Sequence, residues 1–193
     1  MEQIKVGFKL FEITNEVVTN PLKGKIVISK DKRYELYHFD SEEDFSSFIS
    51  KYKTFRKYHI SVPKIVAKSK KDLVAVREHF DVSTCLVLLA NNQIDEKIIE
   101  KLFDMYRIAR TYKFDLDYMP ENYVFDGKKL YYLGLDIIKK NEKYSLENYG
   151  MFYWIYSKEG CKHLSEKGFE TPKNKLNDAE AKKAVVLWVV KYW

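Results

Sequence analysis

The chain has 193 residues, of which 46% are hydrophobic and 16% aromatic, so it can bury a core, and this excludes a disordered protein. The formal charge of +6 is modest beside the 32% of charged residues; it is compatible with phosphate-bearing partners, but a solvated lysine-rich surface is its simpler explanation. The sequence contains neither a signal peptide nor an apolar run of about eighteen residues, so we expect a cytoplasmic protein with no membrane partner.

The first 39 residues predict an antiparallel set of strands. Apolar and polar residues alternate in three segments, which is the pattern of half-buried strands. Asn20-Pro21 breaks the chain after the first segment, and residues 30–33 are typical of a hairpin turn between the second and third. The predicted strands span residues 4–13, 25–29 and 34–39.

Residues 41–58 predict a helix. Ser41 is suited to the N-cap position, and acidic residues 42–44 fill the first turn, where the helix dipole favours negative charge. Apolar side chains then recur at steps of three and four residues, as on the buried face of a helix. They are Phe45, Phe48, Ile49, Tyr52 and Phe55.

Two further strands and a long helix are predicted next. Residues 60–67 and 73–80 have strand character, with the polar residues 68–72 as the turn between them. The short apolar segment 84–89 fits either a helix or a strand. Asp95 can cap a helix over residues 96–112, whose apolar positions keep helical spacing.

Residues 115–138 combine a polar loop with a hairpin. Asp126-Gly127 is a strong turn signal between two segments rich in aromatic and branched residues. Asp117 and Asn122 therefore lie on the loop that enters the hairpin, and Asp136 lies where its second strand ends. The hairpin can bring Asp136 back beside Asn122, so that both share a magnesium ion while Asp117 orients an attacking hydroxyl.

The last third of the chain predicts helices. Ser145 can cap a helix that runs through Tyr156 and that Gly160 ends, and its dense aromatic residues favour a core role over base stacking. Asn177 and Glu180 match a capping box. Residues 184–193 are too few to span a bilayer and predict a buried C-terminal helix, or a strand given their β-branched content.

Cysteine and histidine are too scattered to suggest a metal site or a nucleophile. Cys85 and Cys161 lack metal-ligand spacing, and two cysteines make no disulfide framework, so we expect reduced thiols. The four histidines form no cluster, which argues against a zinc site and a histidine-based nucleophile system.

The segment Asp117-Tyr118-Met119-Pro120-Glu121-Asn122 resembles the catalytic loop of the protein-kinase-like superfamily, in which Asp-x-x-Pro-Glu-Asn is a common form. The resemblance implies that Asp117 is the catalytic base and that Asn122 and Asp136 are the magnesium ligands. Two departures stand beside it: Asp115-Leu116 replaces the family's His-Arg, and Asp136-Ile137-Ile138 replaces Asp-Phe-Gly.

The same resemblance implies an α+β, two-lobed, protein-kinase-like fold. Residues 1–80 would form an N-lobe with a small antiparallel sheet and one helix, and residues 81–193 a reduced helical C-lobe that carries the hairpin 115–138. Val62-Pro63, placed before the expected fourth strand, resembles the same position in small atypical kinases of the RIO and lipopolysaccharide-kinase type. Residues 76–80 resemble the hinge, with Glu78 and Phe80 beside the adenine of ATP.

The phosphate-binding parts of this family are incomplete here. No Gly-x-Gly-x-x-Gly is present. If residues 25–29 are the third strand, Lys30 ends it and Glu43 on the helix is its expected partner. If residues 34–39 are the third strand, which periodicity favours, Tyr37 or His38 takes the place of the lysine and the ATP site is degenerate.

Three functions follow from these patterns. The first is a small kinase-like phosphotransferase that uses ATP and Mg²⁺ on an unidentified acceptor, a protein substrate being one option. The second is a catalytically inactive, pseudokinase-like scaffold that binds a protein partner. The third is a basic nucleic-acid-binding module, because lysines are interleaved with 15 tyrosines.

Overall fold

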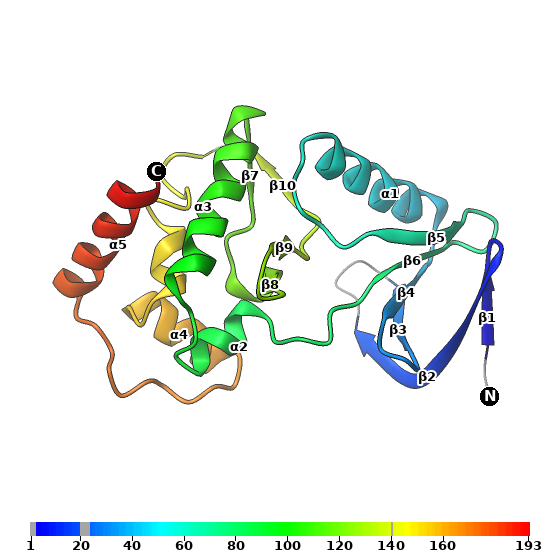
Figure 1. Ribbon diagram of the computed structural model, residues 1–193, viewed down its shortest axis with the longest axis horizontal. Helices are drawn as coiled ribbons and strands as arrows, with labels where there is room; N and C mark the ends of the chain where they lie inside the picture. The colour runs from blue at the N-terminus through cyan, green and yellow to red at the C-terminus, as the bar shows by residue number, and fades with distance from the viewer. Residues whose placement is uncertain (1–2, 20–23, 140) are drawn as a thin grey trace. The chain divides into compact units, whose positions relative to one another are not determined.

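The computed structural model describes residues 3–19, 24–139 and 141–193 (Figure 1). The chain divides into two compact units, Met1–Arg56 with Val62–Asp81 and Lys57–Ser61 with Val82–Trp193. The first unit combines one antiparallel sheet with a helix, and the second is mainly helical with two short antiparallel ladders. The predicted α+β class is therefore confirmed.

The first unit is built on a six-stranded antiparallel sheet. Val6 and Phe11 from its first two strands pack in one apolar cluster with Leu36, Val74 and Val76, so the sheet curls around a core of its own. Its strands, in the order in which they pair, are β1 (Gln3–Val6), β2 (Lys9–Thr19), β3 (Gly24–Ser29), β4 (Tyr34–Phe39), β6 (Val74–Glu78) and β5 (Ile65–Ser69).

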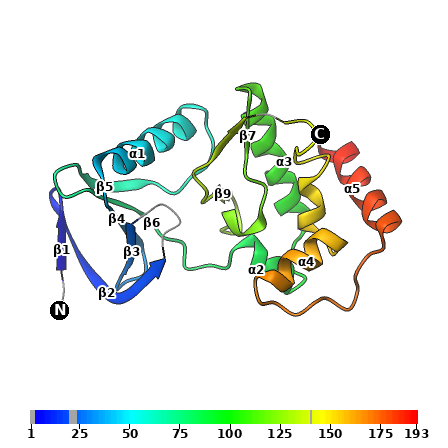
Figure 2. The same cartoon turned by 180° about the vertical axis from the view of Figure 1, so that it is seen from behind.

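Helix α1 (Glu42–Lys57) covers the other face of this sheet and lies alongside β5 in both views (Figures 1 and 2). Ser41 caps it, because its hydroxyl accepts a hydrogen bond from the Asp44 amide at 3.1 Å, as predicted. Phe48 packs its ring against Phe39 and Tyr37 of β4, with ring centroids 5.0 and 5.1 Å apart. Aromatic packing therefore holds the helix to the sheet.

Two predicted strands differ in the structure. The segment 4–13 is a hairpin rather than one strand, because Gly7 turns the chain at a φ of +61°. The segment 60–67 becomes a strand only at Ile65, since Pro63 has no N–H to give to a ladder. The predicted break at Asn20-Pro21 lies outside the described residues.

The second unit is organised around helix α3 (Glu96–Thr111). Asp95 caps it as predicted, with its carboxylate accepting from the Ile98 amide at 2.9 Å. The segment that fitted helix or strand is helix α2 (Cys85–Ala90). The remaining elements are the strands β7 (Phe114–Leu116), β8 (Tyr123–Phe125), β9 (Leu130–Tyr132) and β10 (Ile137–Lys139), the short 3-10 helices η1 (Pro120–Asn122) and η2 (Gly150–Trp154), and the helices α4 (Lys158–Glu166) and α5 (Asp178–Tyr192).

The helix predicted from Ser145 to Tyr156 is wrong. Only η2 (Gly150–Trp154) forms there, and Gly160 lies inside helix α4 rather than at a helix end. A Cβ on Gly160 would lie 2.1 Å from the Ile155 carbonyl oxygen, so glycine is required here for close backbone approach. Ser157 is the true N-cap of α4, accepting from the Gly160 amide at 3.0 Å.

The C-terminal segment forms helix α5, whose predicted capping box between Asn177 and Glu180 is confirmed. The prediction that this helix is buried is wrong, because Val186, Leu187 and Val190 are 50%, 59% and 80% exposed. The helix has only a narrow buried stripe, which includes Ala181 and Val185. No helix among the described residues is long and apolar enough to cross a membrane.

Candidate functional site

The candidate site lies at one end of a two-stranded ladder in the second unit. Strand β7 leads directly into the loop that carries Asp117, and β10 begins directly after Asp136. The two strands pair antiparallel, with Leu116 opposite Ile137. Continuing this register by one residue places Asp117 opposite Asp136, so the ladder sets the two aspartates face to face.

A buried hydroxyl fixes the backbone on both sides of this pair. The Tyr132 hydroxyl accepts a hydrogen bond from the Asp117 amide and donates one to the Asp136 carbonyl, each at 3.2 Å. Tyr132 itself is fully buried on the hairpin strand β9. The hairpin thus positions both aspartates through one side chain.

The Asp117 carboxylate is held by neutral donors. Its Oδ1 accepts from the Met119 amide at 3.1 Å, and its Oδ2 accepts from the Asn122 side-chain amide at 2.9 Å. Burial raises the pKa of Asp117, and the negative charges of Glu121 and Asp136 add to the rise, although its hydrogen bonds with Met119 and Asn122 oppose it. Asp117 is therefore a stronger base than an ordinary aspartate.

Aromatic side chains hydrogen-bond to the backbone of the loop that carries Asp117. The Tyr123 hydroxyl donates to the Asp117 carbonyl at 2.7 Å, and the Trp154 indole N–H donates to the Tyr118 carbonyl at 2.7 Å. A Cβ on Gly150 would lie 2.6 Å from Cγ of Tyr118, so the Tyr118 ring rests directly on the Gly150 backbone. These contacts hold the loop in one conformation.

Glu121 contacts basic side chains of helix α4 and of Lys167, the residue directly after this helix. Its carboxylate contacts His163 Nε2 at 2.8 Å and Lys167 Nζ at 2.9 Å. Burial opposes ionisation of Glu121, but these two partners outweigh it and lower its pKa. Glu121 therefore joins the loop to α4 rather than serving as a base.

Asn122 and Asp136 provide oxygen atoms near the end of the ladder, and the magnesium site expected there stays a prediction. Because the Asn122 amide nitrogen is bonded to Asp117, its Oδ1 points elsewhere as an acceptor, and the Asp136 side chain is exposed. Mg²⁺ takes one or two carboxylates and completes its shell with water and phosphates. Among the residues described, no group of three or more His, Cys, Asp or Glu side chains could hold a metal by itself.

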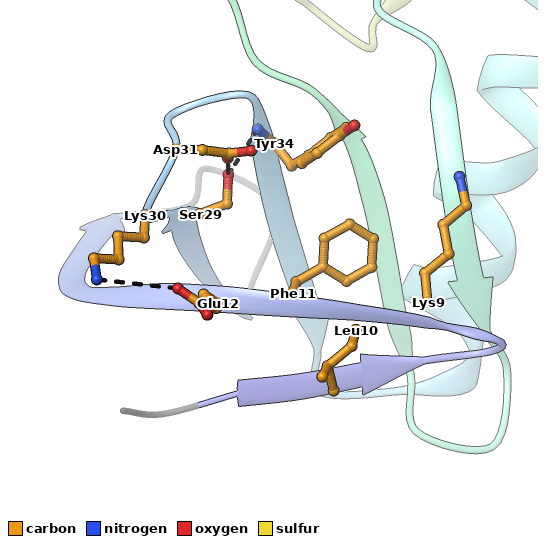
Figure 3. Close-up of a pocket in the computed structure, with 8 residues that line it drawn as sticks. All are labelled: Lys9, Leu10, Phe11, Glu12, Ser29, Lys30, Asp31 and Tyr34. Carbon is orange, nitrogen blue, oxygen red and sulfur yellow. Dashed lines mark hydrogen bonds and ion pairs between the residues drawn. The ribbon is translucent and has the colours of Figure 1, made fainter.

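Lys30 lies at the end of β3 in the first unit and lines a cavity of about 620 Å³ (Figure 3). Its ammonium lies 4.0 Å from the Glu12 carboxylate across the strands, and both side chains are exposed. Phe11 and Tyr34 also line this cavity, and their rings pack edge to face at 77° with centroids 5.4 Å apart. Glu43 is exposed in the first turn of α1. The pairing of Lys30 with Glu43 stays a prediction.

Within the predicted hinge, Glu78, His79 and Phe80 are half-buried at the end of β6. The Glu78 amide donates to the Lys64 carbonyl at 2.9 Å, and the His79 amide donates to the Arg33 carbonyl at 2.8 Å. These two N–H groups are thus used inside the first unit. An adenine contact by Glu78 or Phe80 stays a prediction.

The sequence patterns did not predict an ion-pair network that joins the sheet to helix α1. Arg77 on β6 contacts the Glu35 carboxylate at 2.6 Å through Nε and donates to the Tyr52 hydroxyl at 3.0 Å. His79 Nδ1 and the Tyr37 hydroxyl each lie 2.8 Å from the same carboxylate. One signal was available in the sequence: Arg77 directly follows the apolar residues 74–76 in the same strand, where a charged residue is rarely buried without a partner.

Comparison with known proteins adds no relative: no family model matches the chain, and no curated protein is similar to it in sequence. The chain's own geometry therefore carries the functional argument. Of the predicted site residues, the structure brings Asp117, Asn122 and Asp136 together in the second unit. Lys30, Glu43, Glu78 and Phe80 belong to the first unit.

Proposed function

We propose that the chain is a small kinase-like phosphotransferase that uses ATP and magnesium, with Asp117 as its base. The observation that carries the proposal is the Tyr132 hydroxyl, which ties the backbone of Asp117 to that of Asp136. With Asn122 bonded to Asp117, the three polar residues of the motif converge at one end of a ladder. Phosphoryl transfer needs this combination of a positioned base and two oxygen ligands.

The chain's own residues would position the reaction rather than perform covalent chemistry. The acceptor hydroxyl oxygen bonds to the γ-phosphorus, the bond from that phosphorus to the β-bridging oxygen breaks, and ADP leaves. Asp117 orients the hydroxyl and receives its proton, a role that its raised pKa favours. Asn122 and Asp136 would hold the magnesium ion, which neutralises phosphate charge when bound.

The order of elements supports a two-lobed kinase-like fold. An antiparallel sheet with one helix comes first, and a helical unit that carries the Asp-Asn loop and its hairpin follows. The first unit would serve as the N-lobe of residues 1–80 and the second as the C-lobe of residues 81–193. β4 (Tyr34–Phe39) runs directly into α1, which favours it as the strand that would carry the phosphate lysine.

One observation favours an inactive scaffold that binds a protein partner. Strand β4 contains no lysine: Tyr37 and His38 stand at the expected place, and the half-buried Glu35 carboxylate of the same strand is bound to Arg77. Lys30, the candidate phosphate lysine, directly follows β3 and has an exposed side chain. A degenerate nucleotide site is the consequence if no other cation reaches the phosphates.

Thermal unfolding with and without ATP and magnesium tests the proposal. A ligand at a hundred times its dissociation constant stabilises the fold by about 2.7 kcal/mol. We expect a magnesium-dependent rise in unfolding temperature that Asp136→Ala abolishes. Glu170→Ala is the matched control, because it removes an exposed carboxylate from the same unit and should keep the rise.

Turnover of ATP distinguishes the two candidate functions. Asp117→Asn should lower phosphate transfer or release by roughly a hundredfold or more, as loss of a general base does. The absence of any shift at millimolar ATP, or turnover that Asp117→Asn leaves unchanged, would overturn the phosphotransferase and leave the scaffold.

A further inference from the structure

A separate cavity in the first unit lies between helix α1 and the edge strand β5, which run side by side in both views (Figures 1 and 2). Its volume is about 310 Å³, which is the lower end of the range for small-molecule sites. Every lining residue comes from these two elements. They are Ile49, Tyr52, Lys53, Arg56, Ile65, Val66, Ala67 and Lys68.

The charge of this lining is entirely positive. Lys53, Arg56 and Lys68 line the cavity, and none of the lining residues is acidic. In the part of the chain that the structure describes, none of these three cations has an ion-pair or hydrogen-bond partner for its side chain. By contrast, Lys64 pairs with Glu78 and Lys70 pairs with Glu42, each within a few residues of the cavity. The cavity thus concentrates cations that the protein itself leaves uncompensated.

The floor of the cavity is apolar. Ile49 and Tyr52 are buried, and Ile65, Val66 and Ala67 are half-buried. The ladder is irregular at this point, because Ile65 pairs with Arg77 and Ala67 pairs with Val76, which leaves Val66 as an extra residue. Such bulges bend an edge strand and re-aim its side chains. Here the irregularity opens a hollow beside the helix.

From the positive charge and the apolar floor together, we propose that this cavity binds a small organic anion. The anion would be a phosphate or carboxylate group attached to an apolar ring or short chain. Arg56 can bind such a group in a bidentate manner, and Lys53 and Lys68 add point charges. The apolar body would cover Ile49 and Ile65 and exclude water from them. The site is independent of Asp117, because all its residues lie in the first unit.

Phenyl phosphate is the probe, titrated into the full chain without ATP or magnesium and followed by amide chemical shifts in NMR. We expect saturable shifts confined to residues 49–56 and 65–68. Inorganic phosphate lacks the apolar contact and phenol lacks the charge-assisted hydrogen bonds, so each should bind at least about tenfold more weakly than phenyl phosphate. No saturable binding, or equally strong binding of phosphate alone, would overturn the proposal.

Variants separate the cavity from a general attraction of anions to lysines. Arg56→Gln and Lys68→Gln should each weaken phenyl phosphate binding about tenfold. Lys71→Gln removes an equally exposed charge three residues beyond Lys68, outside the lining, and should leave the affinity within twofold. All three positions are exposed, so the fold should persist. Equal effects of Lys71→Gln and Arg56→Gln would refute the site.

Discussion

The carboxylate of Glu35 in the first unit can be compared with that of Asp117 in the second unit. Each is partly buried and accepts several hydrogen bonds, yet their pKa values move in opposite directions. Burial raises the pKa of Glu35, but the Arg77 charge and the bonds from His79, Tyr37 and Arg77 outweigh it and lower the pKa to about 2. Asp117 is held only by neutral amides and faces other carboxylates, and its pKa is raised.

The opposite pKa shifts distinguish a carboxylate that stabilises the fold, Glu35, from a carboxylate with the proton affinity that a base needs, Asp117. A carboxylate bound to a buried guanidinium stays ionised far below neutral pH, so it does not readily accept a proton. A carboxylate held by neutral donors beside like charges keeps its proton affinity, which is common in functional sites. The comparison therefore associates the Glu35 network with stability and agrees with the proposal that Asp117 acts as a base.

Removing the charge of Glu35 should produce the largest loss of stability. Glu35→Gln removes the negative charge that contacts the buried Arg77 guanidinium, a side chain in a residue that is only 6% exposed. We expect a loss of roughly 3 kcal/mol in the free energy of unfolding at pH 7, as for other broken buried pairs. Urea unfolding followed by circular dichroism measures it.

Glu12→Gln is the control for this variant, because its ion pair with Lys30 is exposed and should contribute less than about 0.5 kcal/mol. The pKa of Glu35 is depressed, so its contribution is complete above the ordinary value of 4.5 and is lost as the pH falls toward 2. The difference in the free energy of unfolding between wild type and Glu35→Gln should therefore shrink as the pH falls from 4.5 toward 2. A difference that stays constant with pH would contradict the assignment.

Sequence patterns found the parts of the fold that short-range chemistry decides. The caps at Ser41, Asp95 and Asn177 were predicted correctly, because each depends on a side chain and an amide three residues away. Gly160 was misread as a helix end, since its role depends on a clash with the Ile155 carbonyl rather than on its φ angle. The exposed face of α5 also followed from packing that no local pattern specifies.

The candidate site divides in the same way. The Asp126-Gly127 turn and its strand-like flanks predicted that Asp117 and Asn122 lie on the loop before a hairpin. The structure adds the hydrogen bond between Asp117 and Asn122. The role of Tyr132 as a bridge could not be predicted, because a tyrosine in a strand is ordinarily a core residue. The bond between Arg77 and Glu35 spans 42 residues, a separation over which sequence periodicity carries no information.

Gly150→Ala should produce an intermediate effect, in the Asp117 loop rather than in the Glu35 network. The new Cβ would lie 2.6 Å from Cγ of Tyr118, which is the root of the side chain and cannot swing aside. We expect a loss of about 2 kcal/mol, typical of overpacking, together with displacement of the loop. Thermal unfolding measures the loss, and amide shifts of residues 117–122 measure the displacement.

Gly127→Asn is the control for this substitution. Gly127 has a φ of +89° with nothing within 4 Å of its Cβ position, and asparagine tolerates this region best among residues with a side chain. Its cost should stay below about 1 kcal/mol. Adding Tyr118→Ala to Gly150→Ala should restore part of the lost stability, and the absence of any recovery would show that the clash is not the cause.

Asp117→Asn should have the smallest effect on stability, and of the opposite sign. Because the folded-state pKa of Asp117 is raised, its ionised form destabilises the fold above that pKa, and the penalty vanishes below the unfolded value of 3.8. The variant should therefore be slightly more stable than the wild type at pH 7, unless the altered bond to Asn122 costs more than the relief of the charge. This gain should disappear as the pH falls below 3.8. A loss of stability as large as that of Glu35→Gln would mean that Asp117 supports the fold as Glu35 does, and would remove the contrast on which its role as a base rests.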